Sequence, residues 1–440
     1  MVQTSFLDPG LETASRERLR AHQLARFRSL LAKILPGNPF YREKLGAAGL
    51  RGAGDLTNLE QLSAFPFTLK SELAKDQATS PPFGTNLTYP IERYVKIHQT
   101  SGTSGGRPLR VLDTQESWSW WLRCWRFVYA GAGVGPGDRV FVAFSFGPFI
   151  GFWAAYEAIP PTGAMALPGG GQDSVQRLRA IQEMGATALV CTPTYALRMA
   201  EVAREHDVDT AAGSVRLTIH AGEPGASIAA TCRRIEEAWG AECHDHTGAS
   251  EVGATGFTCR QRSGVHLIES EFLFEVVDPA TGQHVTPGRR GELVITNLGR
   301  AGMPVIRYRT GDLVELDEGR CGCGRTWARL AGGILGRADE MVVVRGVNVF
   351  PSSIEDIVRE YAAVVEFRIE LIEERQMNEL RLAIEPAVGT SDDESQRLAR
   401  TISDEIHRRL LLRVRCEPVG PGTLPRFELK ARRFLRPQPR

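Results

Sequence analysis

The chain has 440 residues, too many for one ordinary hydrophobic core, so we expect a large domain and at least one smaller one. Hydrophobic residues make up 42% and charged residues 24%, and the net charge of +1 excludes an overall electrostatic attraction to nucleic acids or membranes. Residues 1–10 lack the basic and apolar pattern of a signal peptide, and the most apolar stretch, residues 140–159, is interrupted by Pro148 and Glu157. We therefore expect a cytoplasmic protein without a membrane span.

The first half of the chain alternates between helical and strand patterns. Apolar residues at helical spacing predict helices over residues 15–34, 117–130, 173–184, 195–205 and 228–239. Short apolar runs predict buried strands over residues 91–97, 139–146, 186–191 and 215–220. This alternation is typical of a layered α/β domain with parallel strands.

The second half begins with short strands and ends in a unit of mixed helices and strands. From about Glu269 the pattern predicts strands over residues 272–277, 291–297, 305–308 and 313–316, which indicates a β-rich subdomain. After Gly336 it predicts strands over 341–344, 363–371 and 379–384 and helices over 352–361 and 392–411. We place a domain boundary near Asp339. The predicted fold is therefore α/β, with a large multilayer N-terminal domain of residues 1–338 and a small α+β C-terminal domain of residues 339–440.

A loop rich in glycine and hydroxyl residues follows the predicted strand 91–97. Glycines allow backbone N–H groups to close around phosphate oxygens, and hydroxyls add further donors. The order of residues is not that of a Walker A loop. The composition alone leaves two interpretations open, a phosphate-binding loop and a flexible surface turn. Its candidate phosphate ligands are Thr100, Ser101, Gly102, Thr103, Ser104 and Gly105.

Four residues form a candidate metal site. Cys321 and Cys323 flank one glycine, and Cys259 and His266 lie on either side of a short loop. A set of three cysteines and one histidine suits structural Zn²⁺ and leaves no open position for catalysis. The alternative is that the four are unrelated buried or turn residues. We predict a structural zinc site.

Lysine is rare in this chain. Only six of the 53 basic residues are lysines, and Lys430 is the only lysine after Lys96. One explanation is an arginine-biased genome. The other is that Lys430 has a task that needs a compact charge on a flexible stem, which arginine does not provide.

Several motifs in chain order resemble those of the adenylate-forming superfamily, which comprises acyl-CoA synthetases, adenylation domains and luciferases. The chain most resembles the phenylacetate–CoA ligase family, through its length, Asn38-Pro-Phe-Tyr41, Phe65-Pro-Phe-Thr-Leu-Lys70 and Cys321-Gly-Cys-Gly-Arg325. The resemblance covers almost the whole chain, and members of this family often carry such a zinc site. The superfamily motifs that follow the glycine loop are Ala221-Gly-Glu-Pro224, His246-Thr-Gly-Ala-Ser-Glu251, Tyr308-Arg-Thr-Gly-Asp312, Gly336-Arg-Ala-Asp-Glu-Met, Arg345-Gly-Val-Asn348 and Pro425-Arg-Phe-Glu-Leu-Lys430.

The resemblance implies an aryl-CoA ligase that uses ATP, Mg²⁺ and coenzyme A. Such an enzyme converts an aromatic carboxylic acid to its acyl-AMP and transfers the acyl group to CoA, releasing AMP and pyrophosphate. The nearest alternative is a ligase that loads the phosphopantetheine thiol of a carrier protein. A zinc-stabilised nucleic-acid-binding protein is an alternative of another class, but 52 acidic residues balance the 53 basic ones. The sequence does not decide whether the protein forms a homodimer.

The resemblance also implies roles for single residues. Lys430 would bridge the carboxylate and the α-phosphate, and Glu251 would bind Mg²⁺. Asp312 would accept hydrogen bonds from the ribose hydroxyls, Arg337 would contact the ribose or a phosphate, and Lys70 would lie near the carboxylate or phosphate. The superfamily usually has a tyrosine at the position of Thr247, so the way in which adenine is held stays open. The remaining nucleotide-binding residues would be Gly222, Glu223, Pro224, His246 and Thr247.

The acid pocket is predicted where aromatic and small residues follow the strand 139–146. Aromatic walls with small residues between them suit a flat ring, although such a run is also typical of plain core. No charged residue marks a ring substituent, so phenylacetate, benzoate, hydroxybenzoate and anthranilate all remain candidates. The predicted pocket residues are Phe144, Phe146, Gly147, Phe149, Gly151, His220, Ala221 and Gly248.

The C-terminal domain is expected to be mobile. In the family it rotates after adenylation, which withdraws the lysine and opens a route for the thiol. The resemblance places the hinge at Asp339 and the CoA tunnel at Arg345 and Gly346. Rotation about a few backbone dihedrals needs such a hinge, and glycine allows the pantetheine arm to pass close to the backbone.

Overall fold

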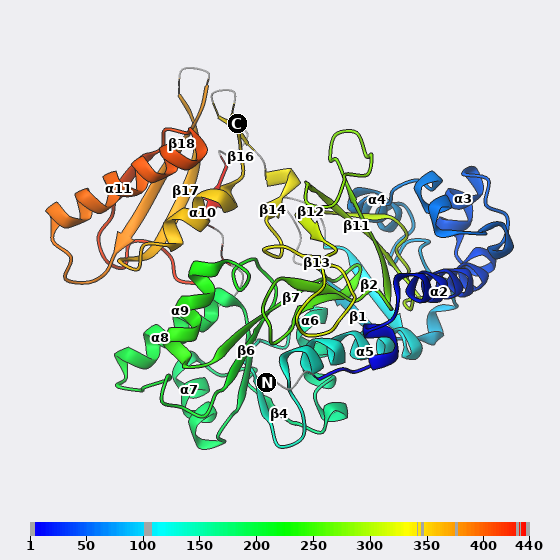
Figure 1. Cartoon of the computed structure of the whole chain (residues 1–440), viewed down its shortest axis with the longest axis horizontal. Helices are drawn as coiled ribbons and strands as arrows, with labels where there is room; N and C mark the ends of the chain where they lie inside the picture. The colour runs from blue at the N-terminus through cyan, green and yellow to red at the C-terminus, as the bar shows by residue number, and fades with distance from the viewer. Residues whose placement is uncertain are drawn as a thin grey trace.

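The protein is a mixed α/β protein with a large N-terminal domain and a smaller C-terminal domain (Figure 1). The computed structural model describes residues 5–100, 108–340, 342–344, 347–374, 377–427, 431 and 433–436. The predicted fold class is confirmed. Two helices near the N-terminus, α2 (Arg16–Gly37) and α3 (Pro39–Ala47), pack at one end of the large domain. Their caps are polar side chains, since Ser15 accepts from the Arg18 N–H and Asn38 accepts from the Tyr41 N–H.

A sheet of twelve strands runs through the large domain. Five of its strands are parallel and have the spatial order β4-β3-β5-β6-β7. Alternate residues of β3 face opposite layers, because Val140 and Val142 join the core cluster of α5 and Phe141 joins that of α7, α8 and α9. The elements are β3 (Arg139–Val142), β4 (Met165–Pro168), β5 (Ala188–Cys191), β6 (Leu217–His220), β7 (Glu242–Ala249), α5 (Gln115–Ala132), α6 (Ile150–Glu157), α7 (Ser174–Glu183), α8 (Pro193–Glu205) and α9 (Ala229–Trp239).

The same sheet continues into the predicted β-rich subdomain. Strand β7 is parallel to β6 on one side and antiparallel to β8 on the other, so it joins the two parts. Beyond β7 the order is β8-β9-β13-β12-β11-β10, with β14 paired to β12. These strands are β8 (Gly253–Thr258), β9 (Val265–Leu267), β10 (Phe272–Val277), β11 (Arg290–Asn297), β12 (Tyr308–Asp317), β13 (Arg329–Leu330) and β14 (Gly336–Arg337).

Two strands predicted for this sheet differ from the structure. The strand expected over 139–146 ends at Val142, and its neighbour β4 ends opposite it at Pro168. The strand expected over 305–308 is absent, since the backbone of Arg307 has φ of 49° and β12 begins only at Tyr308. The Arg307 side chain turns inward there and forms a buried ion pair with Glu275.

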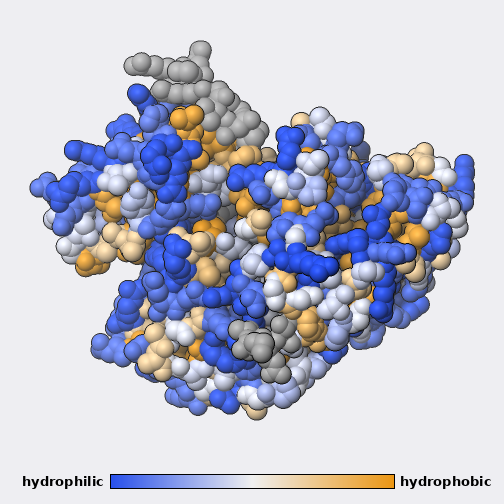
Figure 2. Space-filling view, in the orientation of Figure 1, coloured by the Kyte–Doolittle hydropathy of each residue, from blue (hydrophilic) through white to orange (hydrophobic). Residues whose placement is uncertain are grey.

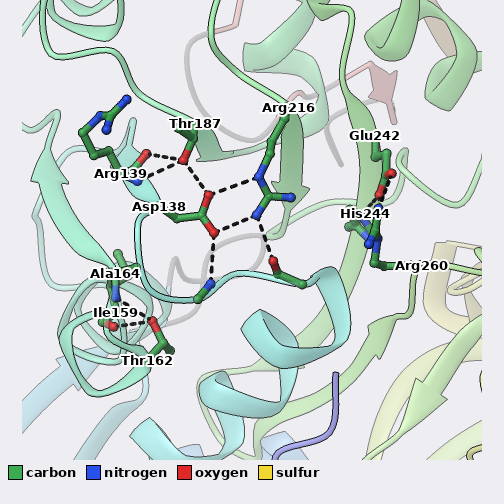
Figure 3. A network of polar contacts seen from close by, with 12 residues as sticks. Asp138, Arg139, Ile159, Thr162, Ala164, Thr187, Arg216, Glu242, His244 and Arg260 are labelled. Carbon is green, nitrogen blue, oxygen red and sulfur yellow. Dashed lines mark hydrogen bonds and ion pairs between the residues drawn. The ribbon is translucent and has the colours of Figure 1, made fainter. Parts of the chain in front are cut away.

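A polar network ties the amino ends of the parallel strands together (Figure 3). The carboxylate of Asp138 accepts hydrogen bonds from Arg216 Nη2 at 2.7 Å, Thr187 Oγ1 at 2.7 Å and the Gly135 N–H at 3.0 Å. Burial raises the pKa of Asp138, but these donors lower it by more, so its pKa lies below the ordinary value. The network joins the segments that precede β3, β5 and β6 and leaves the carboxyl ends of these strands available for a site.

A separate hairpin carries the glycine loop. It consists of β1 (Tyr94–Gln99) and β2 (Arg110–Thr114), which pair antiparallel. The strand predicted over 91–97 is therefore displaced toward the C-terminus, because Ile91–Arg93 forms a 3₁₀ turn. Helix α4 (Lys70–Thr79) precedes this hairpin in the chain.

The C-terminal domain has its own hydrophobic core. Its sheet has the order β19-β18-β17-β20, and the boundary at Asp339 stays a prediction. None of the described helices is both long and apolar enough to cross a membrane. The face in Figure 2 is mostly hydrophilic, with apolar residues in small patches. The C-terminal elements are β15 (Val342–Val344), β16 (Val347–Val349), α10 (Pro351–Arg359), β17 (Val364–Glu374), β18 (Met377–Pro386), α11 (Asp392–Leu410), β19 (Arg415–Pro418) and β20 (Phe434–Leu435).

Candidate active site

Two of the sequence motifs lie at the carboxyl ends of the central strands. Strand β6 ends at His220 and leads directly into Ala221-Gly-Glu-Pro224, and β7 carries His246 and Thr247. Ligands of open α/β sheets bind at this edge. Gly222 has φ of 93°, a conformation that glycine adopts without strain, so the chain can turn sharply there.

Glu251 lies where the parallel and antiparallel parts of the sheet join, in the loop between β7 and β8. Its side chain is only 5% exposed, and its Oε1 is 2.9 Å from Nζ of Lys70, the first residue of α4. Burial raises the pKa of Tyr308, and the negative charge of Glu251 raises it further. The Lys70 ammonium is the counter-ion of this buried carboxylate.

A fully buried ion pair lies behind this loop. Asp113 in β2 and Arg300 are both 0% exposed, and they form two bonds of 2.7 and 2.6 Å. Arg300 Nη1 also donates to the carbonyls of Ser250 and Glu251, at 2.7 and 3.1 Å. The pair therefore connects the hairpin of the glycine loop with the loop of Glu251. Sequence reasoning missed both residues, because no motif distinguishes them.

Asp312 and Arg337 are neighbours on paired strands. They face each other across β12 and β14, and Arg337 Nη1 lies 3.0 Å from Asp312 Oδ1 and 2.9 Å from the Thr310 carbonyl. The two side chains are partly exposed, at 24% and 34%. The structure thus brings together Asp312, which was predicted to bind the ribose, and Arg337, which was predicted to contact the ribose or a phosphate.

His246 and Thr247 both point into the protein. The His246 ring lies 4.3 Å from that of Trp125, and its Nδ1 is 2.8 Å from the Gly256 carbonyl. Burial lowers the pKa of His246 to about 4, so the ring is neutral at pH 7 and Nδ1–H donates to that carbonyl. The Thr247 hydroxyl is 3.2 Å from that of Thr255. Their adenine contact stays a prediction.

Asp245 is a buried acid that sequence reasoning missed. Burial raises its pKa to about 6, while its partners, the Ser227 hydroxyl and the His246 N–H, oppose this rise. Its place within Cys243-His-Asp-His-Thr, directly before the motif of His246, was the available signal. It lies at the same edge of the sheet as the motif residues.

The predicted acid pocket forms an aromatic cluster. Phe144 stacks on Phe152 with ring centroids 3.8 Å apart, and Phe146 packs against Trp153 at 4.9 Å. At Gly151 a side chain would meet no atom within 4 Å, so there is open space beside the cluster. The remaining pocket residues Gly147, Phe149 and Ala221 are partly buried, and Gly248 is exposed.

His220 was predicted to line the acid pocket, and the structure places its side chain inside the sheet. It is fully buried, with Nδ1 3.2 Å from the Cys191 carbonyl and Nε2 2.8 Å from Thr218 Oγ1. Burial lowers its pKa to about 4. Both ring nitrogens thus have partners within the sheet. A small hollow that was not predicted lies beside Glu251 instead, lined by Leu73, Asn86, Leu109, Val111, Met303 and Val305.

The four predicted metal ligands converge. The sulfur atoms of Cys259, Cys321 and Cys323 and a ring nitrogen of His266 all lie within 4.8 Å of one another, and all four residues are buried. Two separations are 3.7 Å between Cys259 and Cys321 Sγ and 3.5 Å between Cys323 Sγ and His266 Nε2. Tetrahedral zinc with ordinary bond lengths places its ligands about 3.8 Å apart for sulfur pairs and about 3.5 Å apart for sulfur and nitrogen. The donor set therefore fits zinc.

Several predicted site residues lie outside the described residues. Thr100 is described, and it closes the base of the glycine loop, since its N–H donates to the Leu109 carbonyl and its Oγ1 accepts from the Leu109 N–H. The structure does not describe the side chain of Asp339 either. The predicted residues that the structure does not describe are Ser101, Gly102, Thr103, Ser104, Gly105, Arg345, Gly346 and Lys430.

The chain matches known families and proteins over most of its length. Residues 68–301 match the AMP-binding enzyme family, and residues 346–436 match the AMP-binding enzyme C-terminal domain. The chain is 33% identical to phenylacetate-coenzyme A ligase of Thermus thermophilus, over 97% of this chain and 98% of that protein. It is 32% identical to phenylacetate-coenzyme A ligase of Pseudomonas putida, over 97% of this chain and 96% of that protein.

A solved ligase resembles the structure in one of its states. 2-Hydroxyisobutyryl-CoA ligase in the postadenylation state has a TM-score of 0.92 at 30% identity, covering 98% of this chain and 92% of that chain. The same ligase in the thioesterification state has a TM-score of 0.73 at 31% identity, covering 97% and 91%. The described structure is nearer to the postadenylation arrangement. The matched domains and the near full-length relatives show that this chain belongs to the adenylate-forming superfamily and the phenylacetate–CoA ligase family, and is an AMP-forming acid–CoA ligase.

Proposed function

We propose that the protein activates an aromatic carboxylic acid with ATP and transfers the acyl group to coenzyme A. In the first step a carboxylate oxygen attacks the α-phosphorus of ATP and pyrophosphate leaves. In the second step the CoA thiol attacks the acyl carbonyl and AMP leaves. The observation that carries this proposal is the buried Glu251 beside Lys70, at the edge of the sheet where two of the superfamily motifs lie.

The first step needs positive charge, because two anions must approach each other. Lys430 would bridge the carboxylate and the α-phosphate, and Lys70 would add charge beside Glu251. Asp312 and Arg337 would hold the ribose, since they lie together and remain partly exposed. Thr100 and the glycine loop would surround the phosphates with hydroxyl and N–H donors.

Magnesium fits the site of Glu251. Mg²⁺ prefers oxygen ligands and is held in nucleotide sites by one or two carboxylates together with phosphate oxygens. Glu251 supplies a buried carboxylate, and the ion would compete with the Lys70 ammonium, 2.9 Å away, for its Oε1. When bound, the ion would neutralise negative charge on the phosphates. The carbonyl contacts of Arg300 would hold the backbone of this ligand in place.

The aromatic character of the acid is supported by the cluster of Phe144, Phe146 and Phe152 and by the open space at Gly151. Ring walls of this kind bury a flat substrate and contact its faces. The names of the relatives support the same class. A second candidate is a small branched 2-hydroxy acid, which the likeness to 2-hydroxyisobutyryl-CoA ligase favours.

A structural Zn²⁺ at Cys259, His266, Cys321 and Cys323 belongs to this proposal. The ion would join the segment after β8 to the segment before β13, because its ligands come from both. Four protein ligands leave no open coordination position, so its contribution is to stability and not to the reaction.

ATP–pyrophosphate exchange with a panel of acids tests the proposed function. The panel contains phenylacetate, benzoate, hydroxybenzoates, anthranilate and 2-hydroxyisobutyrate. We expect exchange that depends on an aromatic acid, and then consumption of CoA when it is added. Exchange only with 2-hydroxyisobutyrate would favour the second candidate. Exchange without CoA consumption would favour a carrier-protein thiol, and no exchange with any acid by folded protein would contradict the proposal.

A further inference from the structure

We propose that Glu223 is a positioning residue that holds the C-terminal domain in the arrangement for adenylation. Its carboxylate would hold the segment that follows Lys430 against the large domain, and it would release this segment before thioester formation. The inference deepens the proposed function and rests on it. Sequence analysis assigned Glu223 to the nucleotide site, and the structure gives its carboxylate two other partners.

Both oxygens of Glu223 accept a hydrogen bond from a backbone N–H. Oε1 accepts from Thr194 at 3.0 Å, in the first turn of α8, and Oε2 accepts from Ala431 at 2.8 Å. Thr194 belongs to the large domain and Ala431 to the C-terminal domain. A charged acceptor makes stronger hydrogen bonds than a neutral one, and the N-terminus of α8 favours negative charge. Glu223 is thus a carboxylate shared by the two domains.

A second connection lies next to the first. Arg433, two residues after Ala431, places Nη1 3.3 Å from the Thr194 hydroxyl. Its guanidinium is held within the C-terminal domain by Glu366 of β17, through bonds of 2.6 and 3.0 Å. Thr194 therefore has its N–H bonded to Glu223 and its hydroxyl near Arg433. The two connections place Ala431 and Arg433 beside the first turn of α8.

A small hollow beside this contact has mostly polar walls. The hollow is open to solvent, and its walls come from α8, α9 and the C-terminal domain. Polar interfaces with few apolar contacts are typical of domains that move relative to each other. The walls include Leu197, Arg198, Arg234, Arg359, Arg426 and Phe427.

The bond to Ala431 can exist only in this arrangement of the domains. If the C-terminal domain rotates, Thr194 stays with Glu223, because both belong to the large domain, but Ala431 moves away. Glu223 therefore stabilises the adenylation arrangement selectively. Because Ala431 directly follows Lys430 in the chain, fixing its N–H limits the positions that Lys430 can occupy. A group that acts in this way influences one half-reaction and not the other.

Glu223→Ala and Glu223→Gln test this role in the two half-reactions. Adenylation is followed by ATP–pyrophosphate exchange, and thioester formation is followed with supplied acyl-AMP and CoA. We expect Glu223→Ala to lower kcat for exchange about tenfold, the effect of losing one charge-assisted hydrogen bond, and to change thioester formation less than about twofold. Glu223→Gln keeps one acceptor oxygen and should have an intermediate effect. The matched control is Glu205→Ala, which changes an exposed residue at the end of α8, the helix whose first turn Glu223 contacts.

Equal losses in both half-reactions would overturn the proposal, because they indicate a merely structural role. An unchanged rate of ATP–pyrophosphate exchange in Glu223→Ala would overturn it too. Amide hydrogen exchange gives a readout that does not need activity. The peptide that contains Ala431 should exchange faster in Glu223→Ala and at the wild-type rate in Glu205→Ala. If the wild type adenylates no acid but the Ala431 peptide still exchanges amide hydrogens faster in Glu223→Ala, the proposed function fails and the contact between Glu223 and Ala431 stands. If amide hydrogen exchange of the peptide that contains Ala431 is unchanged in Glu223→Ala, Glu223 does not hold this segment.

Discussion

At the scale of single residues, the candidate site depends on pairs that are distant in the sequence. Glu251 could be predicted as a metal ligand from its motif. Its contact with Lys70 and the support from Arg300 and Asp113 could not, because they are tertiary contacts between segments that no motif connects. Thr247 was the residue at which the motif departed from the family, and the structure shows its hydroxyl turned toward Thr255.

The buried pair of Asp113 and Arg300 gives a prediction at this scale. Asp113→Asn leaves the Arg300 charge buried with a weaker partner, which should lower the free energy of unfolding by about 3–5 kcal/mol. Urea denaturation followed by circular dichroism measures this change. Glu60→Gln removes one partner of the exposed pair with Arg20 and should change stability by less than about 1 kcal/mol. A loss below about 1 kcal/mol in Asp113→Asn would contradict the role of the pair.

At the scale of elements, the strands and helices were largely predictable and their pairing was not. Apolar periodicity indicated α8, α9 and the parallel strands β3, β5 and β6, because burial imposes that pattern, but it did not indicate β4 or β7. It could not show that β7 pairs in parallel with β6 and antiparallel with β8, since strand pairing depends on residues elsewhere in the chain. The backbone of Arg307, which interrupts a predicted strand, left no signal in the pattern either.

The Asp138 network gives a pH prediction for the ends of the parallel strands. The pKa of Asp138 is lower in the folded protein than its ordinary value, so its contribution to stability is present above about pH 4 and is lost as pH falls through the folded pKa. Asp138→Asn should therefore lower the free energy of unfolding by about 1–3 kcal/mol at pH 7. The difference from wild type should shrink below about pH 4. A difference that is constant between pH 3 and 7 would contradict this explanation.

The cysteine and histidine cluster joins elements that the chain brings together only on folding. We expect about one zinc ion per chain by elemental analysis, as a Cys₃His set requires. Cys321→Ser should lose the ion and lower the thermal unfolding midpoint by several degrees. Cys416→Ser changes a cysteine outside the cluster and should retain the ion. Wild-type protein without zinc, purified in the absence of chelators, would contradict the site.

At the scale of the whole molecule, the proposed reaction would be divided between the two domains. The large domain holds the described nucleotide-site residues, and the C-terminal domain carries Lys430. The likeness to a postadenylation structure agrees with an arrangement that must change before the thiol reacts. The relative position of the domains could not be predicted from the sequence, because it depends on polar contacts such as that of Glu223 with Ala431.

Lys430→Ala should separate the two half-reactions. Without the lysine charge the carboxylate and the α-phosphate repel each other, so ATP–pyrophosphate exchange should fall by at least about a hundredfold. Thioester formation from supplied acyl-AMP should continue, because the lysine is withdrawn in that step. Lys75→Ala, at an exposed position in α4, should leave both steps unchanged. Loss of both steps in Lys430→Ala would indicate a structural role.

Transfer of ¹⁸O tests the formation of the acyl-adenylate most directly. An aromatic acid labelled with ¹⁸O in its carboxylate is incubated with the enzyme, ATP, Mg²⁺ and CoA. The mass of the nucleotide product is then measured by mass spectrometry. If the carboxylate oxygen attacks the α-phosphorus, that oxygen leaves with AMP when the thiol attacks, so AMP should carry one ¹⁸O atom. Unlabelled AMP, or ADP with the label in phosphate, would show that no acyl-adenylate forms.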